Sequence, residues 1–435
     1  MLKRLETYFE FERLGTNWRT EALAGLTTFL TMAYIVLVNP SILATTGMPL
    51  GAVTAATCLS AGFASILMGI IARYPLAMAP GMGLNAYFAF VVCAKMHVPW
   101  PTALGAVFLS GLLFLMLTAA GIRQMILRAI PHELYAAVAS GIGLFIAFIG
   151  FKNAGLVVAD PATLLALGSL RNPTTALALI GLLLMVALEA KQVKGAILIG
   201  VLATTGIAWA CGVTHWHTID GGITSLTATA FKLDIRGAFS QGIVEIIFVF
   251  FFVDLFDNLG TLVGVTKRAG LITNEHEIPR LNRILTADAT ATLFGSMIGT
   301  STVTSYVEST AGVMVGGRSG ITAIVTGLLF LGSIVFTPFV GIVPTAATAP
   351  ALILVGSLML STISEIRWHK PLVAVPSFLT VVLIPFTYSI ANGLGFGVIS
   401  WAALHIFTGN ARKQDWLLYV LAILFLARFL YLGAS

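Results

Sequence analysis

The chain has 435 residues, of which 58% are hydrophobic and only 10% are charged. A soluble globular domain carries about 25% charged residues, so this composition excludes an ordinary soluble protein and predicts an all-α polytopic membrane protein embedded in the lipid bilayer. The net charge of +6 is an orientation signal of membrane loops rather than the footprint of a nucleic-acid partner.

Residues 1–20 carry charges of both signs without an apolar core of the signal type, which predicts a cytoplasmic N-terminal segment. Apolar stretches follow in two sets of seven, separated by a polar outer loop at 213–240. The first set lies near 21–43, 51–72, 75–94, 101–121, 132–150, 174–190 and 194–212. The second set lies near 241–263, 286–300, 302–316, 320–341, 347–363, 373–390 and 392–408. A further apolar segment, 415–433, contains Arg428 and is either a last span or an interfacial helix.

The basic residues fix the orientation of these spans. With a cytoplasmic N-terminus and fourteen alternating spans, most of the 24 Lys and Arg residues fall on the inner side, as the positive-inside rule requires. We therefore expect a multi-pass protein of the plasma (cell inner) membrane. The three cysteines are far apart and have neither disulfide nor metal-ligand spacing, so we expect no metal and no cofactor.

The two halves of the chain resemble each other at a nearly constant offset. SGLLFL at Ser110–Leu115 recurs as TGLLFL at Thr326–Leu331, and Gly141 in SGIGLF matches Gly356 in VGSLML. Seven spans per half is an odd number, so the second half must enter the membrane from the opposite side. This predicts two inverted seven-span repeats, the architecture of many secondary transporters.

The third span of each half begins poorly as a helix. In the first, Pro80 removes a backbone donor, and Gly81 and Gly83 weaken helix formation. The second, Gly299–Gly312, is rich in Thr, Ser and Val, which favour an extended chain. We expect short extended pieces leading into half-helices in spans 3 and 10. Paired broken segments of this kind indicate a substrate site near the membrane midplane.

Acidic side chains lie inside the apolar second half of the chain. A carboxylate in the bilayer costs about 2.5 kcal/mol or more even on lenient insertion scales, so it faces a cavity or a partner. Asp254, Asp257, Asn258 and Thr261 have the i, i+3, i+4, i+7 spacing of one polar helix stripe, whereas Glu245 lies nearer the outer end and is left out of the site. Two nearby carboxylates in a partly dry cavity do not both ionise readily, which favours a proton-coupled cycle.

Asn85 and Glu308 fall near the start of the two half-helices. A carboxylate and an amide match a flat heterocycle that has N–H donors and carbonyl or ring-nitrogen acceptors, and Tyr87 or Tyr306 offers a stacking surface. The same groups also match a cation, and the residues alone leave both ligands open.

At these residues the chain resembles the azaguanine-type purine permeases of the nucleobase–ascorbate transporter superfamily. The resemblance covers essentially the whole chain and is carried by TNWRTEALAGLTTFLTMAYIVLVNP, APGMGLNAYFAF, VDLFDNLGTLVGVTKRAGL and GTSTVTSYVESTAGVMVGGRSGIT. It implies a proton-coupled importer of purine bases (adenine, guanine or hypoxanthine), without enzyme activity, and a homodimer. The ranking of the three bases stays open.

The resemblance also implies a domain division and a site. Spans 1–4 and 8–11 would form a core domain, spans 5–7 and 12–14 would form a gate domain, and short strands in spans 3 and 10 would meet at the site. The core then comprises 21–121 and 241–341, and the gate comprises 132–212 and 347–408. We expect substrate binding by Asn85, Asp257, Thr261, Tyr306 and Glu308, and proton coupling by Asp254, Asp257 and Glu308.

One position departs from the related uracil and xanthine permeases. There the span-8 acid is followed four residues later by a histidine, whereas here Thr261 follows Asp257. The departure makes Asp254 the candidate for the coupling acid. We expect substrate and proton to bind between spans 1, 3, 8 and 10, and the core to slide against the gate as an elevator.

Three other function classes fit these residues less well. An anion transporter on the same fold would need a positive or neutral site rather than three acids. An intramembrane enzyme would use Asp254 and Asp257 as an aspartyl pair, but two aspartates on one turn of one helix make a poor catalytic dyad. A channel fits less well than alternating access, because broken inverted helices surround a closed acidic site.

Overall fold

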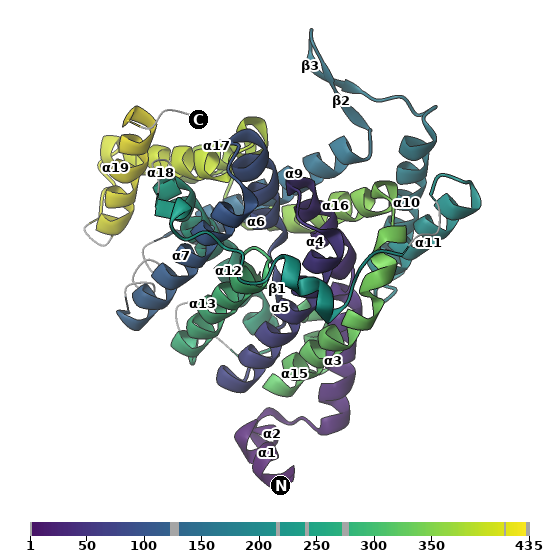
Figure 1. The fold of residues 1–435 in the computed structure, drawn as a ribbon. Helices are drawn as coiled ribbons and strands as arrows, with labels where there is room; N and C mark the ends of the chain where they lie inside the picture. Colours follow the sequence, from purple (N-terminus) through teal and green to yellow (C-terminus); the bar gives the residue numbers. More distant parts are fainter. Residues whose placement is uncertain are drawn as a thin grey trace.

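The computed structural model describes residues 2–121, 130–214, 218–239, 243–271, 278–412 and 415–431. The described chain is mostly helical and includes two small two-stranded sheets (Figure 1). Eight of the described helices, counting those that continue through a kink or a 3-10 turn, are long and apolar enough to cross a membrane.

The elements of the first half follow the predicted apolar stretches closely. They are α1 (Leu2–Tyr8), α2 (Phe11–Leu14), α3 (Trp18–Met32), α4 (Ile35–Leu43), α5 (Leu50–Ile71), β1 (Met78–Pro80), α6 (Met82–Ala86), a π-helical segment (Tyr87–Lys95), α7 (Trp100–Ala119), α9 (His132–Asn153), β2 (Val157–Asp160), β3 (Leu164–Leu167), α10 (Pro173–Ala190) and α11 (Ala196–Ala210). The hairpin β2–β3 was not predicted, and it projects from the helical body (Figure 1).

The second half begins with short 3-10 turns and then repeats this order of long helices around one broken segment. Its elements are α12 (Ile243–Arg268), α13 (Leu281–Ile298), β4 (Val303–Ser305), α14 (Ser309–Met314), α15 (Gly320–Gly332), α16 (Thr345–Leu360), a 3-10 turn (Ser361–Glu365), α17 (Pro371–Thr387), α18 (Ile390–Phe407) and α19 (Trp416–Tyr431). The last helix, α19, packs beside α18, where Arg428 donates to the Asn392 side chain at 3.1 Å.

The first predicted span, 21–43, is two helices rather than one. The helix breaks after Met32, and α4 begins at Ile35. Pro40 lies inside α4, and because proline has no N–H it leaves the carbonyl of Val36 without its usual helical donor. The break puts Tyr34 at the junction of the two helices.

A buried carboxylate ties α3 to the start of α15. Glu21 accepts hydrogen bonds from the backbone N–H groups of Arg318 (2.9 Å), Ser319 (3.1 Å) and Thr322 (3.3 Å), and from the Thr322 hydroxyl (2.6 Å). The Thr322 N–H belongs to the first turn of α15, and the N–H groups of Arg318 and Ser319 immediately precede it, so none of the three has an acceptor within the helix. Glu21 therefore caps α15 and explains why α3 and α15 lie side by side (Figure 1).

The two broken segments meet in the middle of the molecule. β1 and β4 pair antiparallel, with Ala79 opposite Thr304, and β1 lies among the surrounding helices (Figure 1). All six strand residues are buried. Extended backbone at this depth is possible because the strands pair with each other and helix hydroxyls serve their outer edges. The Ser65 hydroxyl bonds to the backbone of Met78, and the Thr292 hydroxyl bonds to the backbone of Val303.

The two halves of the chain pack closely where their helices carry small residues. α9 packs along α16, where Gly143 and Gly356 face each other. A Cβ atom on Gly356 would lie 2.3 Å from the Gly143 carbonyl oxygen and 2.7 Å from the Ala147 nitrogen. Small residues permit such close backbone approach in membrane helices. Gly141 and Gly356, matched in the sequence, thus lie on two helices that pack directly together.

This crossing yields a stability prediction. Gly356→Ala should lower the melting temperature of the detergent-solubilised protein, because overpacking against backbone costs about 1–3 kcal/mol. Gly206→Ala is the matched control, since a Cβ there meets nothing within 4 Å and alanine is the better helix former by up to about 1 kcal/mol. Equal melting temperatures for the two variants would contradict the close α9–α16 crossing.

Candidate functional site

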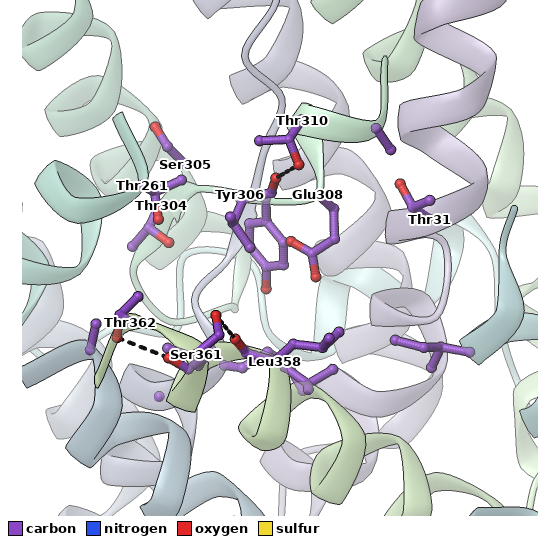
Figure 2. Close-up of a pocket in the computed structure, with 18 of the residues that line it drawn as sticks. Thr31, Thr261, Thr304, Ser305, Tyr306, Glu308, Thr310, Leu358, Ser361 and Thr362 are labelled. Carbon is purple, nitrogen blue, oxygen red and sulfur yellow. Dashed lines mark hydrogen bonds between the residues drawn. The ribbon is translucent and has the colours of Figure 1, made fainter. Parts of the chain in front are cut away.

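A cavity of about 790 Å³ lies against the crossed segments. One side is formed by the α3–α4 break, α6, α12 and the β4–α14 segment, and the other by α9, the α10–α11 turn, α16 and the 3-10 turn after it. Figure 2 shows Glu308 and Tyr306 near the centre of the view, with Leu358, Ser361 and Thr362 of the other side facing them.

Glu308 lines this cavity, and its predicted role in substrate binding stays a prediction. It directly precedes α14, in the turn that joins the strand to the half-helix. Its carboxylate Oε1 accepts a hydrogen bond of 2.7 Å from the hydroxyl of Tyr34. The residue as a whole is half-buried and lines the cavity, so it is accessible to a ligand there.

Tyr306 also lines the cavity, and its position is fixed from two directions. Its hydroxyl donates to the Pro80 carbonyl at 2.5 Å, and its backbone N–H donates to the Ala77 carbonyl at 3.0 Å. Both bonds reach the other broken segment. Tyr306 therefore helps to hold the two broken segments together, and its ring presents an aromatic surface next to Glu308 (Figure 2).

The hydroxyls of Thr261, Thr304 and Ser305 gather on one side of the cavity (Figure 2). Thr261 comes from the polar stripe of α12, and the other two come from β4. Hydroxyl groups both donate and accept, so this group suits a ligand that carries both kinds of polar atom.

Asn85 lies elsewhere. It is buried and donates to the side-chain oxygen of Asn39, whose own amide donates to Thr57 at 2.8 Å, and it is not among the cavity-lining residues. The strand register explains this position. Glu308 is four residues beyond Thr304, and the residue four beyond its partner Ala79 is Gly83, which does line the cavity. Substrate binding by Asn85 stays a prediction.

The acids of α12 are only partly described. Asp254 is fully buried and lies outside the cavity lining. The side chains of Asp257 and Glu245 lie outside the part of the chain that the structure describes. The predicted roles of Asp254 and Asp257 therefore stay predictions, while Thr261 of the same stripe lies at the cavity.

Several lining residues were not predicted. Tyr34 bonds to Glu308, which is 274 positions away in the sequence. Nothing in the sequence around Tyr34 indicates that it lines a polar site. On the opposite side are Tyr135, Glu189, Gln192, and His132 with its Nε2 atom 3.5 Å from a carboxylate oxygen of Glu365. These residues stand at helix ends, where charged groups are common, so only their spatial convergence identifies them.

A bundle of membrane helices around two crossed, broken segments with a polar cavity is the arrangement of a solute transporter. The fold agrees with that class. The structure is similar to the transmembrane domain of a cyanobacterial bicarbonate transporter, with a TM-score of 0.61, 16% sequence identity, and coverage of 87% of this chain and 97% of that chain.

Sequence comparison gives the family. The profile of a group described as a permease family matches residues 19–394. The chain is 43% identical to an adenine permease of Escherichia coli K12, over 99% of this chain and 97% of that protein. It is also 43% identical to a guanine/hypoxanthine permease of Bacillus subtilis 168, over 98% of this chain and 100% of that protein. The chain belongs to this permease family, that of the nucleobase–ascorbate transporters.

The contact between the two broken segments can be tested through Ser309. Its buried hydroxyl accepts the backbone N–H of Ala77 at 3.0 Å and so links β1 to α14. Ser309→Ala leaves that buried N–H without an acceptor, which should cost about 1–3 kcal/mol of stability and lower the melting temperature. Thr310→Ala is the control, since its hydroxyl bonds only within its own turn, to the Val307 carbonyl. If both variants melt alike, the link across the crossing is not structural.

Proposed function

We propose that this chain is a secondary active transporter that imports purine nucleobases by proton symport. The observation that carries the proposal is the half-buried Glu308 beside the Tyr306 ring in a cavity of about 790 Å³. Relatives that match it over nearly their whole length are named adenine and guanine/hypoxanthine permeases. They support a purine base as the ligand of that cavity.

The chemistry of the site suits a purine. Adenine, guanine and hypoxanthine are flat rings that carry both N–H donors and carbonyl or ring-nitrogen acceptors. The Glu308 carboxylate accepts from a ring N–H as a charge-assisted hydrogen bond, the Thr261 and Thr304 hydroxyls serve either kind of ring atom, and Tyr306 offers a face for stacking. Pockets for small ligands measure about 300–1,000 Å³, and this cavity lies within that range.

The proposal includes fourteen spans in two inverted repeats. Packing supports this layout, because exchanging the halves maps the main helix contacts onto one another. The α5–α15 contact corresponds to α13–α7, α10–α11 corresponds to α17–α18, and α10–α16 corresponds to α17–α9. The β1–β4 pair and the α9–α16 pair map onto themselves, as they would if a twofold pseudo-axis passed between them.

We further propose that the core and gate domains move against each other as an elevator. The helices assigned to the core pack mainly with one another, as α15 does with α3 and α5, and the gate helices do likewise, as α9 does with α16 and α17. The cavity takes its lining from both sets. A ligand held between two separately packed bodies is carried when one body slides along the other.

The orientation of the cavity follows from the predicted topology. Glu189 and Gln192 line it next to Lys191, and Glu365 lines it next to Arg367. The basic residues mark the cytoplasmic helix ends by the positive-inside rule. With the N-terminus in the cytoplasm, the structure would represent the inward-facing state in the cell inner membrane. A homodimer is part of the proposal on family resemblance alone.

Proton coupling is proposed for Asp254 with Glu308 and Asp257. Asp254 is fully buried on the same helix that brings Thr261 to the cavity. A buried carboxylate that takes up a proton loses the cost of a buried charge, so protonation and movement of the core through the bilayer favour each other. An anion substrate is disfavoured, because the carboxylates of Glu308, Glu189 and Glu365 line the cavity.

Substrate binding by Glu308 yields a prediction. Glu308→Gln should weaken equilibrium binding of radiolabelled hypoxanthine, guanine or adenine by about 10–100-fold, because a hydrogen bond to a charged group contributes about 1.5–3 kcal/mol. Glu365→Gln is the matched control, since it removes the same charge from a half-exposed position at the cavity edge. Unchanged affinity in Glu308→Gln would contradict this assignment.

The hydrogen bond between Tyr34 and Glu308 yields another prediction. Tyr34→Phe removes the hydroxyl that donates to Glu308 at 2.7 Å and should weaken base affinity by about threefold to tenfold, the range of an ordinary hydrogen bond. In a Glu308→Gln background the same change should add little, because the two residues act as one unit. Fully additive effects in this double-mutant cycle would show that Tyr34 does not act through Glu308.

A further inference from the structure

A second cavity, of about 330 Å³, lies away from the first and is lined by four arginines. Arg13 comes from the N-terminal helix α2, Arg73 follows α5, Arg280 precedes α13 and Arg318 precedes α15. Among the described residues that line it, none is acidic. The cavity therefore gathers guanidinium groups from four segments that are far apart in the sequence.

Ion pairs and hydrogen bonds hold the arginine side chains in place. Glu10 pairs with Arg13 and Arg280, and also with Arg73 at 3.4 Å. The Arg318 side chain donates to the carbonyls of Val313 (2.6 Å) and Gly317 (2.8 Å). Each guanidinium has five N–H donors in a planar fork, and these bonds use only some of them. Within the described part of the chain, two carboxylates, Glu10 and Glu21, contact these four arginines, so positive charge remains in excess there.

Arg73 and Arg280 make further hydrogen bonds, and Arg73 also has a donor that no described protein atom accepts. Arg73 also donates to the Tyr8 carbonyl at 3.1 Å and stacks over the Tyr8 ring, while Arg280 donates to the Ala72 carbonyl at 3.2 Å. Within the described structure, Nε of Arg73 is buried without a hydrogen-bond acceptor. Both residues adopt left-handed backbone conformations, with φ of 61° and 57°, which non-glycine residues rarely adopt and which tend to cluster at functional sites.

We propose that this second cavity is a binding site for a phosphate group, borne either by a soluble metabolite or by an anionic lipid headgroup. Guanidinium forks match phosphate oxygens in geometry and bind them bidentately, and basic pockets between membrane helices take up anionic headgroups. The site joins the N-terminal segment to three turns of the core domain, so an occupied site fastens that segment to the core.

The test uses the full-length, delipidated protein in neutral detergent. The probes are inorganic phosphate against chloride at matched ionic strength, and short-chain phosphatidylglycerol against short-chain phosphatidylcholine. The readouts are the melting temperature and the equilibrium binding of radiolabelled phosphate. Arg13→Gln and Arg19→Gln form a matched pair, because both arginines are exposed and close in sequence, but only Arg13 lines the cavity.

Phosphate, phosphatidylglycerol or both should raise the melting temperature saturably in the wild type. Arg13→Gln should weaken that binding by about tenfold, as expected for the loss of one charge-assisted contact, and Arg19→Gln should leave it within about twofold. A response to phosphate alone identifies a soluble ligand, a response to phosphatidylglycerol alone identifies a lipid headgroup, and a response to both identifies a site that accepts the phosphate group from either source. The proposal is overturned if neither probe exceeds its control, or if the two variants respond alike.

Discussion

The antiparallel pairing of β1 with β4 is the constraint on which the site depends. Two segments that cannot continue as helices satisfy each other's backbone at the centre of a helical bundle, where an unpaired strand would be prohibitively costly. The same pairing fixes the chain direction at both exits. The residue four positions beyond the paired centre therefore reaches the cavity from each segment, as Gly83 from one and Glu308 from the other.

The proposed elevator movement would divide the site into two parts. Tyr34, Tyr306 and Glu308 are joined to one another or to β1 by hydrogen bonds and belong to the proposed core, whereas the facing residues of α9, α16 and the α10–α11 turn belong to the proposed gate. Recognition of the base would then lie largely on one side and closure on the other. A site divided in this way can be exposed alternately without being rebuilt in each cycle.

Much of the architecture was predictable because membrane spans are long apolar runs. The broken segments were also predictable, because they carry residues that disfavour a helix, such as Pro80 and the threonines in and around β4. Glu308 and Tyr306 were found at the cavity for the same reason. What the sequence did not indicate depends on tertiary convergence. Tyr34 lies at the cavity because of a helix break and bonds to a partner 274 residues away. The hydrogen bond from Asn85 to Asn39 depends on a strand register that no local sequence pattern encodes.

The central claim is that this cavity carries a purine base together with a proton. The most direct measurement is uptake of radiolabelled hypoxanthine, guanine and adenine into proteoliposomes, with and without an inwardly directed proton gradient. The account predicts that the gradient stimulates uptake of at least one base and that a protonophore abolishes the stimulation. Uptake of none of the three by folded protein, or uptake indifferent to the gradient, would contradict it.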